Sequence, residues 1–256
     1  MSGGGRDTDS DWKRVAQDDP YWGVLSQDEY RKGAVDAKRL AQFMATGEEF
    51  VANLLALARK HLDPDFAPKR AFDFGCGVGR LLIPLARRVE QAVGADVAPA
   101  MLALCERHAK QAGVANVTLV SSDDGLRGVE GPFDLVNSFI VLQHIPPARG
   151  YGLIQALIDR LATGGIGSIQ VTYAKSRELL VHEAPRAHYY RRDGDTIVDL
   201  VEAGGWSPPE GTINMYDYDL NEVMARIARH AGHPVIVLPT GDGGHLGTHF
   251  VFRKAR

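Results

Sequence analysis

Three glycines in five positions, within the segment DFGCGVG at residues 73–79, constrain this chain more than any other feature. The segment ends an apolar run that predicts a strand over residues 70–75, and it opens a run that predicts a helix over 79–89. A loop between a strand and a helix can present backbone N–H groups to a ligand, and glycine there permits positive φ and close approach of the ligand. The segment therefore predicts a ligand-binding turn at the carboxyl edge of a sheet.

Alternating strands and helices follow this turn. Helices are predicted at 99–112 and 148–162, and strands at 91–97, 117–122, 133–141 and 167–174. This alternation predicts an α/β fold with a parallel sheet and helices on both faces. A helix over 218–231 and two apolar segments, 234–240 and 248–254, end the chain. The Gly-rich turn between the two segments predicts an antiparallel hairpin.

The rest of the chain divides into three regions. Residues 1–10 are expected to be a disordered tail, and residues 11–66 an N-terminal helical cap region in which segments 26–29 and 46–49 fit the capping-box pattern. Residues 67–256 form the predicted ligand-binding domain. Within it, residues 175–216 lack a strong period and predict an insertion after the fifth strand, either a substrate lid or a solvated loop or subunit contact.

Length and composition exclude several classes of protein. The 256 residues suffice for one α/β domain with an added segment, and the net charge of −3 gives no general attraction to nucleic acid or to an anionic membrane. The N-terminus lacks the apolar stretch of a secretory signal, and two cysteines are too few for a disulfide framework or a Cys-based zinc site. We therefore expect a cytoplasmic protein. A metal site is not expected, because His245 and His249 flank a turn and lack a carboxylate or Cys partner.

Two acids indicate which ligand the turn binds. Asp96 lies near the end of the second predicted strand, about 20 residues after Gly75, which is near the spacing of an acid that accepts from both hydroxyls of a ribose. The glycines read G-x-G-x-G and depart from the dinucleotide pattern G-x-G-x-x-G. Asp73, two positions before Gly75, is unfavourable beside a pyrophosphate and favourable beside a cation. S-adenosylmethionine (SAM) has both an adenosine ribose and a cationic sulfonium and ammonium group.

With these residues the sequence resembles the class I SAM-dependent methyltransferases, over about residues 70–174 and the closing hairpin. The family's acid-x-G-x-G-x-G motif matches residues 73–79, its ribose acid matches Asp96, and its adenine-contacting acid matches Asp123, with Asp124 the alternative. The resemblance implies a Rossmann-like sheet of seven strands, the last antiparallel, and SAM as cofactor with S-adenosylhomocysteine as product. It also implies cofactor contacts from Asp73, Gly75, Cys76, Gly77, Gly79, Asp96, Val97, Asp123, Asp124, Ser138 and Phe139.

Methyl transfer from a sulfonium is an in-line displacement whose leaving group departs neutral, so the protein must chiefly align the reactants and exclude water. A general base is needed only for a hydroxyl or a protonated amine. His144, which follows the fourth predicted strand, is the candidate base. The alternative is a loop histidine that caps backbone or packs against the pocket. Likewise, aromatics such as Trp12 and Tyr30 either close the pocket or pin the N-terminal helices to the core.

These observations predict a methyltransferase acting on a small-molecule acceptor, with O-methylation favoured over N-methylation and no nucleic-acid or membrane partner. The Arg and Tyr content of residues 182–192 favours a polar or anionic acceptor. A nicotinamide-dependent oxidoreductase is one alternative, disfavoured by the absent G-x-x-G step and the antiparallel ending. A non-catalytic SAM-binding or scaffold protein is the other.

Overall fold

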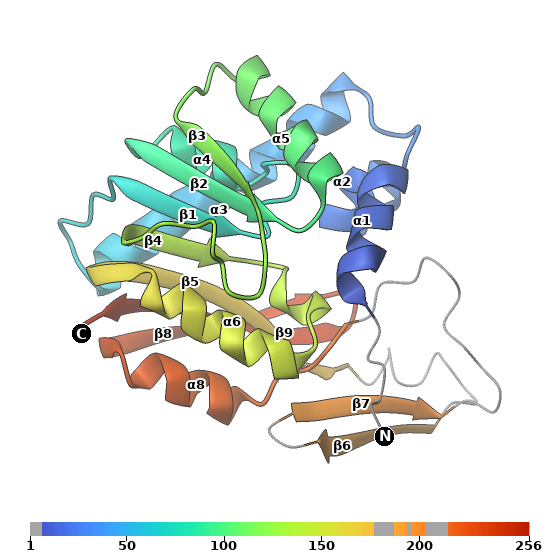
Figure 1. Ribbon diagram of the computed structural model, residues 1–256, viewed down its shortest axis with the longest axis vertical. Coiled ribbons are helices and arrows are strands. Elements are labelled where there is room, and N and C mark those ends of the chain that lie inside the picture. The colour runs from blue at the N-terminus through green and yellow to red at the C-terminus, as the bar shows by residue number, and fades with distance from the viewer. Residues whose placement is uncertain (1–6, 177–186, 194–195, 203–214, 256) are drawn as a thin grey trace.

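The computed structural model describes residues 7–176, 187–193, 196–202 and 215–255. Its central feature is a seven-stranded sheet with the order β3-β2-β1-β4-β5-β9-β8 (Figure 1). The strands are β1 Arg70–Phe74, β2 Gln91–Asp96, β3 Val117–Ser121, β4 Phe133–Ser138, β5 Leu161–Lys175, β8 Ala231–Asp242 and β9 His245–Lys254. The first five pair in parallel, whereas β9 runs antiparallel to both β5 and β8. The predicted sheet and its closing hairpin are confirmed.

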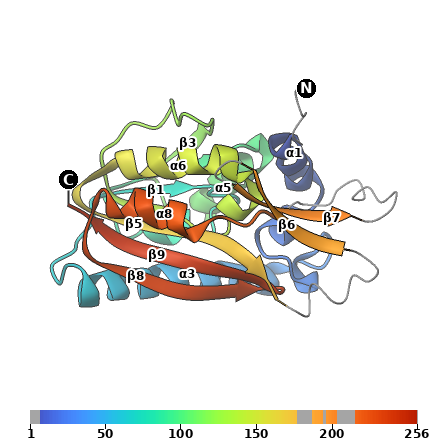
Figure 2. The same ribbon diagram turned by 90° about the horizontal axis from the view of Figure 1, so that it is seen from below.

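Helices cover both faces of this sheet. The helix α3 (Ala37–His61) lies on one side, and α6 (Pro147–Asp159) and α8 (Leu220–Ala228) lie on the other (Figure 2). The shorter α4 (Leu82–Ala86) and α5 (Pro99–Gln111) share the α3 side, where their apolar residues pack around the glycine loop. Strand residues alternate between the two cores, because successive side chains of a strand point to opposite faces.

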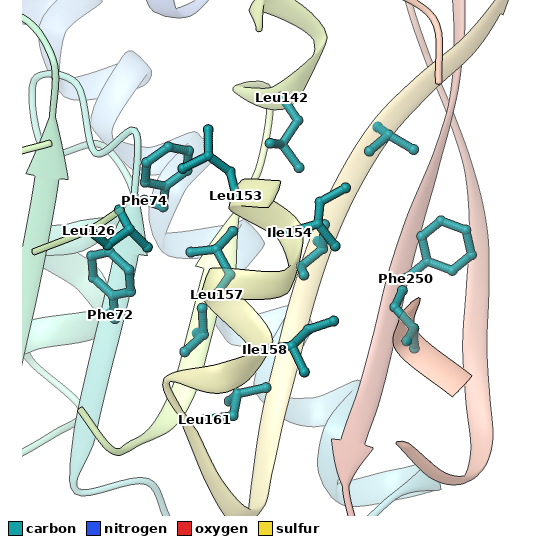
Figure 3. Close-up of a cluster of buried hydrophobic side chains, with 14 of the residues drawn as sticks. Phe72, Phe74, Leu126, Leu142, Leu153, Ile154, Leu157, Ile158, Leu161 and Phe250 are labelled. Atoms are coloured by element: carbon teal, nitrogen blue, oxygen red, sulfur yellow. The ribbon is translucent and has the colours of Figure 1, made fainter. Parts of the chain in front are cut away.

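The core between the sheet and α6 is the largest apolar cluster. Phe72 and Phe74 of β1 face α6, whose residues 153–158 supply the opposing apolar side chains, and Phe250 of β9 belongs to the same cluster farther along the sheet (Figure 3). The inward positions of α6 recur at helical spacing, which explains why the chain forms a helix there and why that face is buried. This core holds β1 and β4 side by side, and their carboxyl ends border the cleft described below.

The N-terminal region differs from expectation in three places. Three helical elements, α1 (Thr8–Asp18), α2 (Pro20–Val24) and η1 (Asp28–Tyr30), precede α3. Disorder over residues 1–10 is wrong for residues 8–10, because the Asp7 side chain accepts from two backbone N–H groups and caps α1. Both predicted capping boxes are also wrong: the hydroxyl of Thr46 donates to Phe43 O inside α3, and that of Ser26 donates to Trp22 O. Such local bonds are the usual alternative to capping for Ser and Thr.

Several boundaries also moved. The predicted helix over 79–89 is reduced to α4, because Gly79 has φ +91° and prolongs the loop. The predicted strand over 133–141 ends at Ser138, since Ile140 has φ +61° and the short helix η2 (Leu142–His144) follows. Positive φ is unusual for a β-branched residue, and no apolar pattern reveals it.

The predicted insertion lies partly outside the described residues. Within it, β6 (Ala187–Asp193) and β7 (Thr196–Glu202) form a two-stranded antiparallel sheet of their own (Figure 1). The lid expected over 175–216 therefore stays a prediction, because most of the side chains on which it rests are not described. Across the described ranges, no helix combines the length and the apolar character needed to cross a membrane.

Candidate functional site

A cleft opens at the carboxyl edge of the sheet and encloses ≈ 940 Å³ of empty space, its open mouth included. Figure 1 shows α1 and α2 beside this edge. Most residues predicted to bind the ligand line the cleft: Asp73, Gly75, Cys76, Gly77, Asp96, Val97, Asp123, Asp124, Phe139 and His144. Gly79 and Ser138, which were also predicted, do not line it. The sheet topology brings the ends of β1, β2, β3 and β4 together, and this explains why residues from four strands meet there.

The glycine loop is fixed to the end of β2. The N–H groups of Gly75 and Cys76 donate to Ala95 O at 2.8 and 3.0 Å, and Gly77 N donates to Asp96 Oδ2 at 2.9 Å. Gly75 and Gly77 have φ of +71° and +52°, in the region that favours glycine. A Cβ at Gly75 would also overlap the side chain of Val141. The loop thus keeps its backbone bare where it faces the cleft.

Gly79 and Ser138 have other surroundings. A Cβ at Gly79 would lie 2.8 Å from Cys105 Sγ, so this glycine allows the loop to pack on α5. Ser138 is fully buried, and its hydroxyl has no hydrogen-bond partner among the described residues. Cys76 lines the cleft, yet its thiol is buried beside Cys105, and that neighbour and its burial raise the pKa of the thiol. A nucleophilic role for Cys76 is therefore disfavoured.

Asp73 is a buried carboxylate at the floor of the cleft. It is 3% exposed, and its Oδ1 accepts from Asn137 Nδ2 at 2.7 Å. Burial raises the pKa of Asp73 to about 7, against the opposing effects of the Asn137 hydrogen bond and of the Arg80 charge. The charge of Asp96 adds to the increase. A nearby cation would favour the ionised form of this buried carboxylate and offset the cost of its burial.

Arg80, which the sequence reasoning missed, is a buried cation in the same cleft. It is 6% exposed, and its guanidinium donates to Thr46 Oγ1 at 3.4 Å. Burial lowers the pKa of Arg80 to about 10. Its Nε has no hydrogen-bond partner, and no ion pair joins the guanidinium to a carboxylate within the described part of the chain. A buried, unpaired cation is costly, so the site calls for an anionic group beside Arg80.

The other three predicted acids occupy two other parts of the cleft. Asp96 accepts from Gly77 N and from Ala98 N at 2.8 Å; burial raises its pKa, and these bonds oppose the rise. Asp123 is half-exposed, and hydrogen bonds from Arg127 lower its pKa. Asp124 instead pairs with a residue of α6. Asp96 is thus a half-buried acid at the end of the second strand, as its place in the sequence predicts.

Arg149 of α6 was also missed, and it ties the N-terminal helix to the cleft. Its guanidinium binds Asp124 at 2.6 Å and Asp9 at 3.1 Å, and these bonds raise its pKa. The ring of Trp12 in α1 meets the ring of His144 edge-on, with centroids 4.7 Å apart. Trp12 therefore reaches the cleft, whereas Tyr30 packs on Phe43 of α3. Tyr30 thus pins the N-terminal helices, whereas closure of the pocket by Trp12 stays a prediction.

His144 is held by a chain of amide groups. Ile140 N donates to Gln170 Oε1 at 3.0 Å, and Gln170 Nε2 donates to Gln143 Oε1 at 3.4 Å. Gln143 Nε2 then lies 3.4 Å from His144 Nε2. Because an amide nitrogen can only donate, Nε2 of a neutral His144 accepts, and its proton lies on Nδ1. A general base at Nε2 would first have to release Gln143, so the base role stays a prediction.

The residues of the cleft match a ligand group that carries both an ammonium and a carboxylate, as an amino acid does. The described part of the chain holds no group of three or more His, Cys, Asp or Glu side chains that could bind a metal. It does hold one buried carboxylate and one buried guanidinium on the same cleft, without an ion pair between them. Sheet order, glycine loop and acids together define a Rossmann-like α/β protein of the methyltransferase type.

Comparison with known proteins identifies a methyltransferase domain within the chain. Residues 71–165 match a family model described as a methyltransferase domain. The ubiquinone biosynthesis O-methyltransferase of Ruegeria pomeroyi is 34% identical over 155 residues, which is 56% of this chain and 62% of that protein. Matches to three ubiquinone biosynthesis O-methyltransferases span between 40% and 62% of the length of those proteins. Residues 71–165 therefore carry a methyltransferase domain, and the chain is similar to SAM-dependent methyltransferases.

Solved structures share the fold at low sequence identity. Magnesium protoporphyrin IX methyltransferase from Synechocystis PCC 6803, with bound S-adenosylhomocysteine, has a TM-score of 0.58 at 19% identity, over 92% of this chain and 97% of that chain. A SAM-bound amino pentose methyltransferase from Micromonospora echinaspora has a TM-score of 0.56 at 19% identity, over 86% of this chain and 97% of that one. The likeness extends beyond the matched domain to most of the chain.

Proposed function

We propose that this protein is a SAM-dependent methyltransferase with a small-molecule acceptor, and that oxygen is favoured over nitrogen as the acceptor atom. The observation that carries the proposal is the pair of buried charges, Asp73 and Arg80, on one cleft without an ion pair between them. The amino-acid end of SAM carries one ammonium and one carboxylate group, so it matches both side chains. The preference for oxygen is supported only by the names of relatives such as the Ruegeria pomeroyi protein.

The other cleft residues would hold the nucleoside. The bare backbone of the glycine loop accommodates a ligand that lies against it. Asp96, at the end of β2, would accept from the ribose hydroxyls, and Asp123 or Asp124 from the adenine amino group, as the family resemblance implies. Val97 and Phe139 line the same cleft and would flank the adenosine.

When bound, SAM supplies an electrophilic methyl group on a sulfonium. The protein's own residues have to align the acceptor and keep water out. Trp12 and His144 line the cleft and have no assigned contact with the cofactor, so they would border the acceptor. A polar or anionic acceptor was expected from residues 182–192, whose side chains lie outside the described set, and that expectation stays a prediction.

Calorimetry with SAM, S-adenosylhomocysteine and NADH tests the binding part of the proposal. We expect binding of the first two and none of NADH; the reverse would favour the oxidoreductase. Asp96→Ala should weaken SAM binding by about tenfold or more, because a half-buried charged hydrogen-bond acceptor is lost. Asp96→Asn retains one acceptor for the loop N–H groups and should keep the fold. Unchanged affinity in both variants would show that the ribose contact is misassigned.

Single turnover with methyl-labelled SAM and a pool of metabolites tests catalysis. Transfer of label to a small molecule would support the proposal and identify the acceptor atom. Tight SAM binding with no transfer to any acceptor, in a protein whose binding site is intact, would favour the non-catalytic alternative.

A further inference from the structure

Four buried polar side chains form a row across the sheet, from the cleft to the opposite half of the molecule. They are Asp73 on β1, Asn137 on β4, Ser168 on β5 and His249 on β9. Asp73 and Asn137 are register partners, and so are Asn137 and Ser168. His249 pairs with Gln170, two residues beyond Ser168, so it lies diagonally across from Ser168 on the same face.

This row interrupts a face that is otherwise apolar. Two residues away on the same four strands, the face carries Ala71, Leu135, Ile166 and Val251, which share one apolar cluster beneath α3. Apolar residues therefore fit this face of the sheet, and buried polar side chains cost more unless each is hydrogen-bonded. The polar row lies where β1 reaches the cleft, and this position indicates a role in the site.

Every hydrogen bond of the row donates toward Asp73. Asn137 Nδ2 donates to Asp73 Oδ1 at 2.7 Å, and Ser168 Oγ donates to Asn137 Oδ1 at 2.7 Å. The single hydroxyl proton of Ser168 is then used, so His249 Nε2, at 2.8 Å, must donate to Ser168 Oγ. Burial lowers the pKa of His249 to about 4, and the ring is therefore neutral at pH 7 with its proton on Nε2. Hydrogen bonds aligned in one direction strengthen one another.

We propose that His249 is a positioning residue of the cofactor site, which acts through Ser168 and Asn137 to keep the Asp73 carboxylate ionised and oriented in the cleft. The row does not conduct protons, because the Asn137 amide donates and accepts but does not ionise. The proposal rests on the proposed function only for the identity of the cation that Asp73 meets. The charged groups that face Asp73 are Arg80 and Asp96, and the tests leave both unchanged.

Two substitutions at His249 separate its donor from its shape. The ring lies against Phe50 and Phe139, with centroids 5.8 and 5.2 Å away, so His249→Phe keeps the aromatic packing and removes the donor. His249→Gln keeps an N–H at the end of a side chain of similar reach. Ser168→Ala breaks the row at a second point without changing the ring.

The decisive measurement is a ¹³C NMR titration of Asp73 in ligand-free protein labelled at aspartate carboxyl carbons, with the spectrum of Asp73→Asn to assign the signal. His249→Phe should move the Asp73 midpoint to higher pH, and His249→Gln should return it. Affinity for S-adenosylhomocysteine at pH 7 should fall about fivefold in His249→Phe, the effect of one net hydrogen bond. Adding Ser168→Ala to His249→Phe should weaken binding little further, because the row is already broken.

Thermal unfolding distinguishes this result from a loss of structure. The inference would be overturned if natively folded His249→Phe kept the wild-type titration midpoint of Asp73 and the wild-type affinity for S-adenosylhomocysteine. It would also be overturned if His249→Gln behaved like His249→Phe. If the wild-type protein binds neither SAM nor S-adenosylhomocysteine, the proposed function fails, and the titration alone then decides the role of His249.

Discussion

Asp73 and Arg80 are buried groups whose charged forms are disfavoured by desolvation. Each influences the pKa of the other, although no ion pair joins them. Burial penalises both charged forms, and the hydrogen bonds present satisfy only part of each group. Proteins retain such an arrangement at sites where a ligand completes it. Removing either charge should therefore weaken cofactor binding, whereas removing the buried guanidinium should not weaken the fold.

Cofactor affinity should depend on pH through Asp73. Its pKa is raised to about 7, and a cation binds the ionised form more tightly, so SAM affinity should rise as pH increases toward neutrality and level off above about pH 7. Asp73→Asn should weaken binding and flatten this profile. Calorimetry across the range checks it; an identical slope in the Asn variant would assign the dependence to another group.

Removing the guanidinium of Arg80 should weaken binding without weakening the fold. Arg80→Met should lower SAM affinity by about tenfold or more, while the free energy of unfolding stays equal or increases, since a buried and unpaired cation is replaced by an apolar chain. Arg87→Met is the matched control, because Arg87 is half-exposed and its pairing with Glu48 lies on the surface. Equal binding losses in both variants would contradict the role of Arg80.

At the scale of elements, the short helix η2 is held in place by a tyrosine that is distant in the sequence. The hydroxyl of Tyr218, just before α8, hydrogen-bonds to Leu142 O at 2.9 Å and to Ile145 O at 2.8 Å. Gly150 of α6 leaves room for this hydroxyl, because a Cβ there would overlap it. The position of His144 in the cleft thus depends on one glycine in a neighbouring helix.

Two glycines of α6 test this dependence. Gly150→Ala should destabilise the protein by about 1–3 kcal/mol through overpacking against Tyr218. Gly152→Ala, in the same helix, meets nothing within 4 Å and should stabilise by about 0.5–1 kcal/mol through helix propensity. Urea unfolding of both variants measures the difference. A stabilised Gly150→Ala would show that Tyr218 moves freely and does not fix η2.

Elements with a regular apolar period were predictable, and those set by distant contacts were not. The alternation after residue 70 predicts the five parallel strands because burial on both faces requires it. The turn at Ile140 depends on Gln170, which accepts its N–H from a neighbouring strand, and no local signal carries that bond. The capping boxes failed because α3 begins after Asp36, upstream of Thr46, whose hydroxyl bonds within the helix.

At the scale of the whole molecule, two buried groups make stability depend on pH in opposite directions. The pKa of His249 is lowered to about 4, so its contribution is complete above the unfolded value of 6.5 and is lost as pH falls through 4. The pKa of Asp73 is raised to about 7, so its contribution is present below the unfolded value of 3.8 and is lost as pH rises through 7. The two effects oppose each other over the shared window.

Replacing His249 should remove one of the two. His249→Gln should lose less stability than the wild type as pH falls from 6.5 to 4, by about 2–3 kcal/mol at the acid end. His245, whose pKa burial also lowers to about 4, stays in both proteins and cancels in the comparison. Denaturant unfolding at several pH values checks this; parallel curves would mean that His249 ionises without cost in the folded protein.

The site residues, like the elements of the fold, divide into those that the sequence predicts and those that depend on distant contacts. The glycine loop and Asp96 were found from sequence because their spacing along one strand-helix-strand unit carries the signal. Arg149, Gln170 and the row that ends at His249 depend on tertiary structure, above all on β9, which inserts between β5 and β8. Arg80 was within reach, since it directly follows the third glycine, but its importance comes from burial.

A crystal structure with S-adenosylhomocysteine tests the central claim most directly. We predict the ligand's carboxylate within hydrogen-bond distance of the Arg80 guanidinium, its ammonium facing Asp73, and its ribose against Asp96. A ligand bound elsewhere, or bound here with its amino-acid end away from both buried charges, would contradict the account.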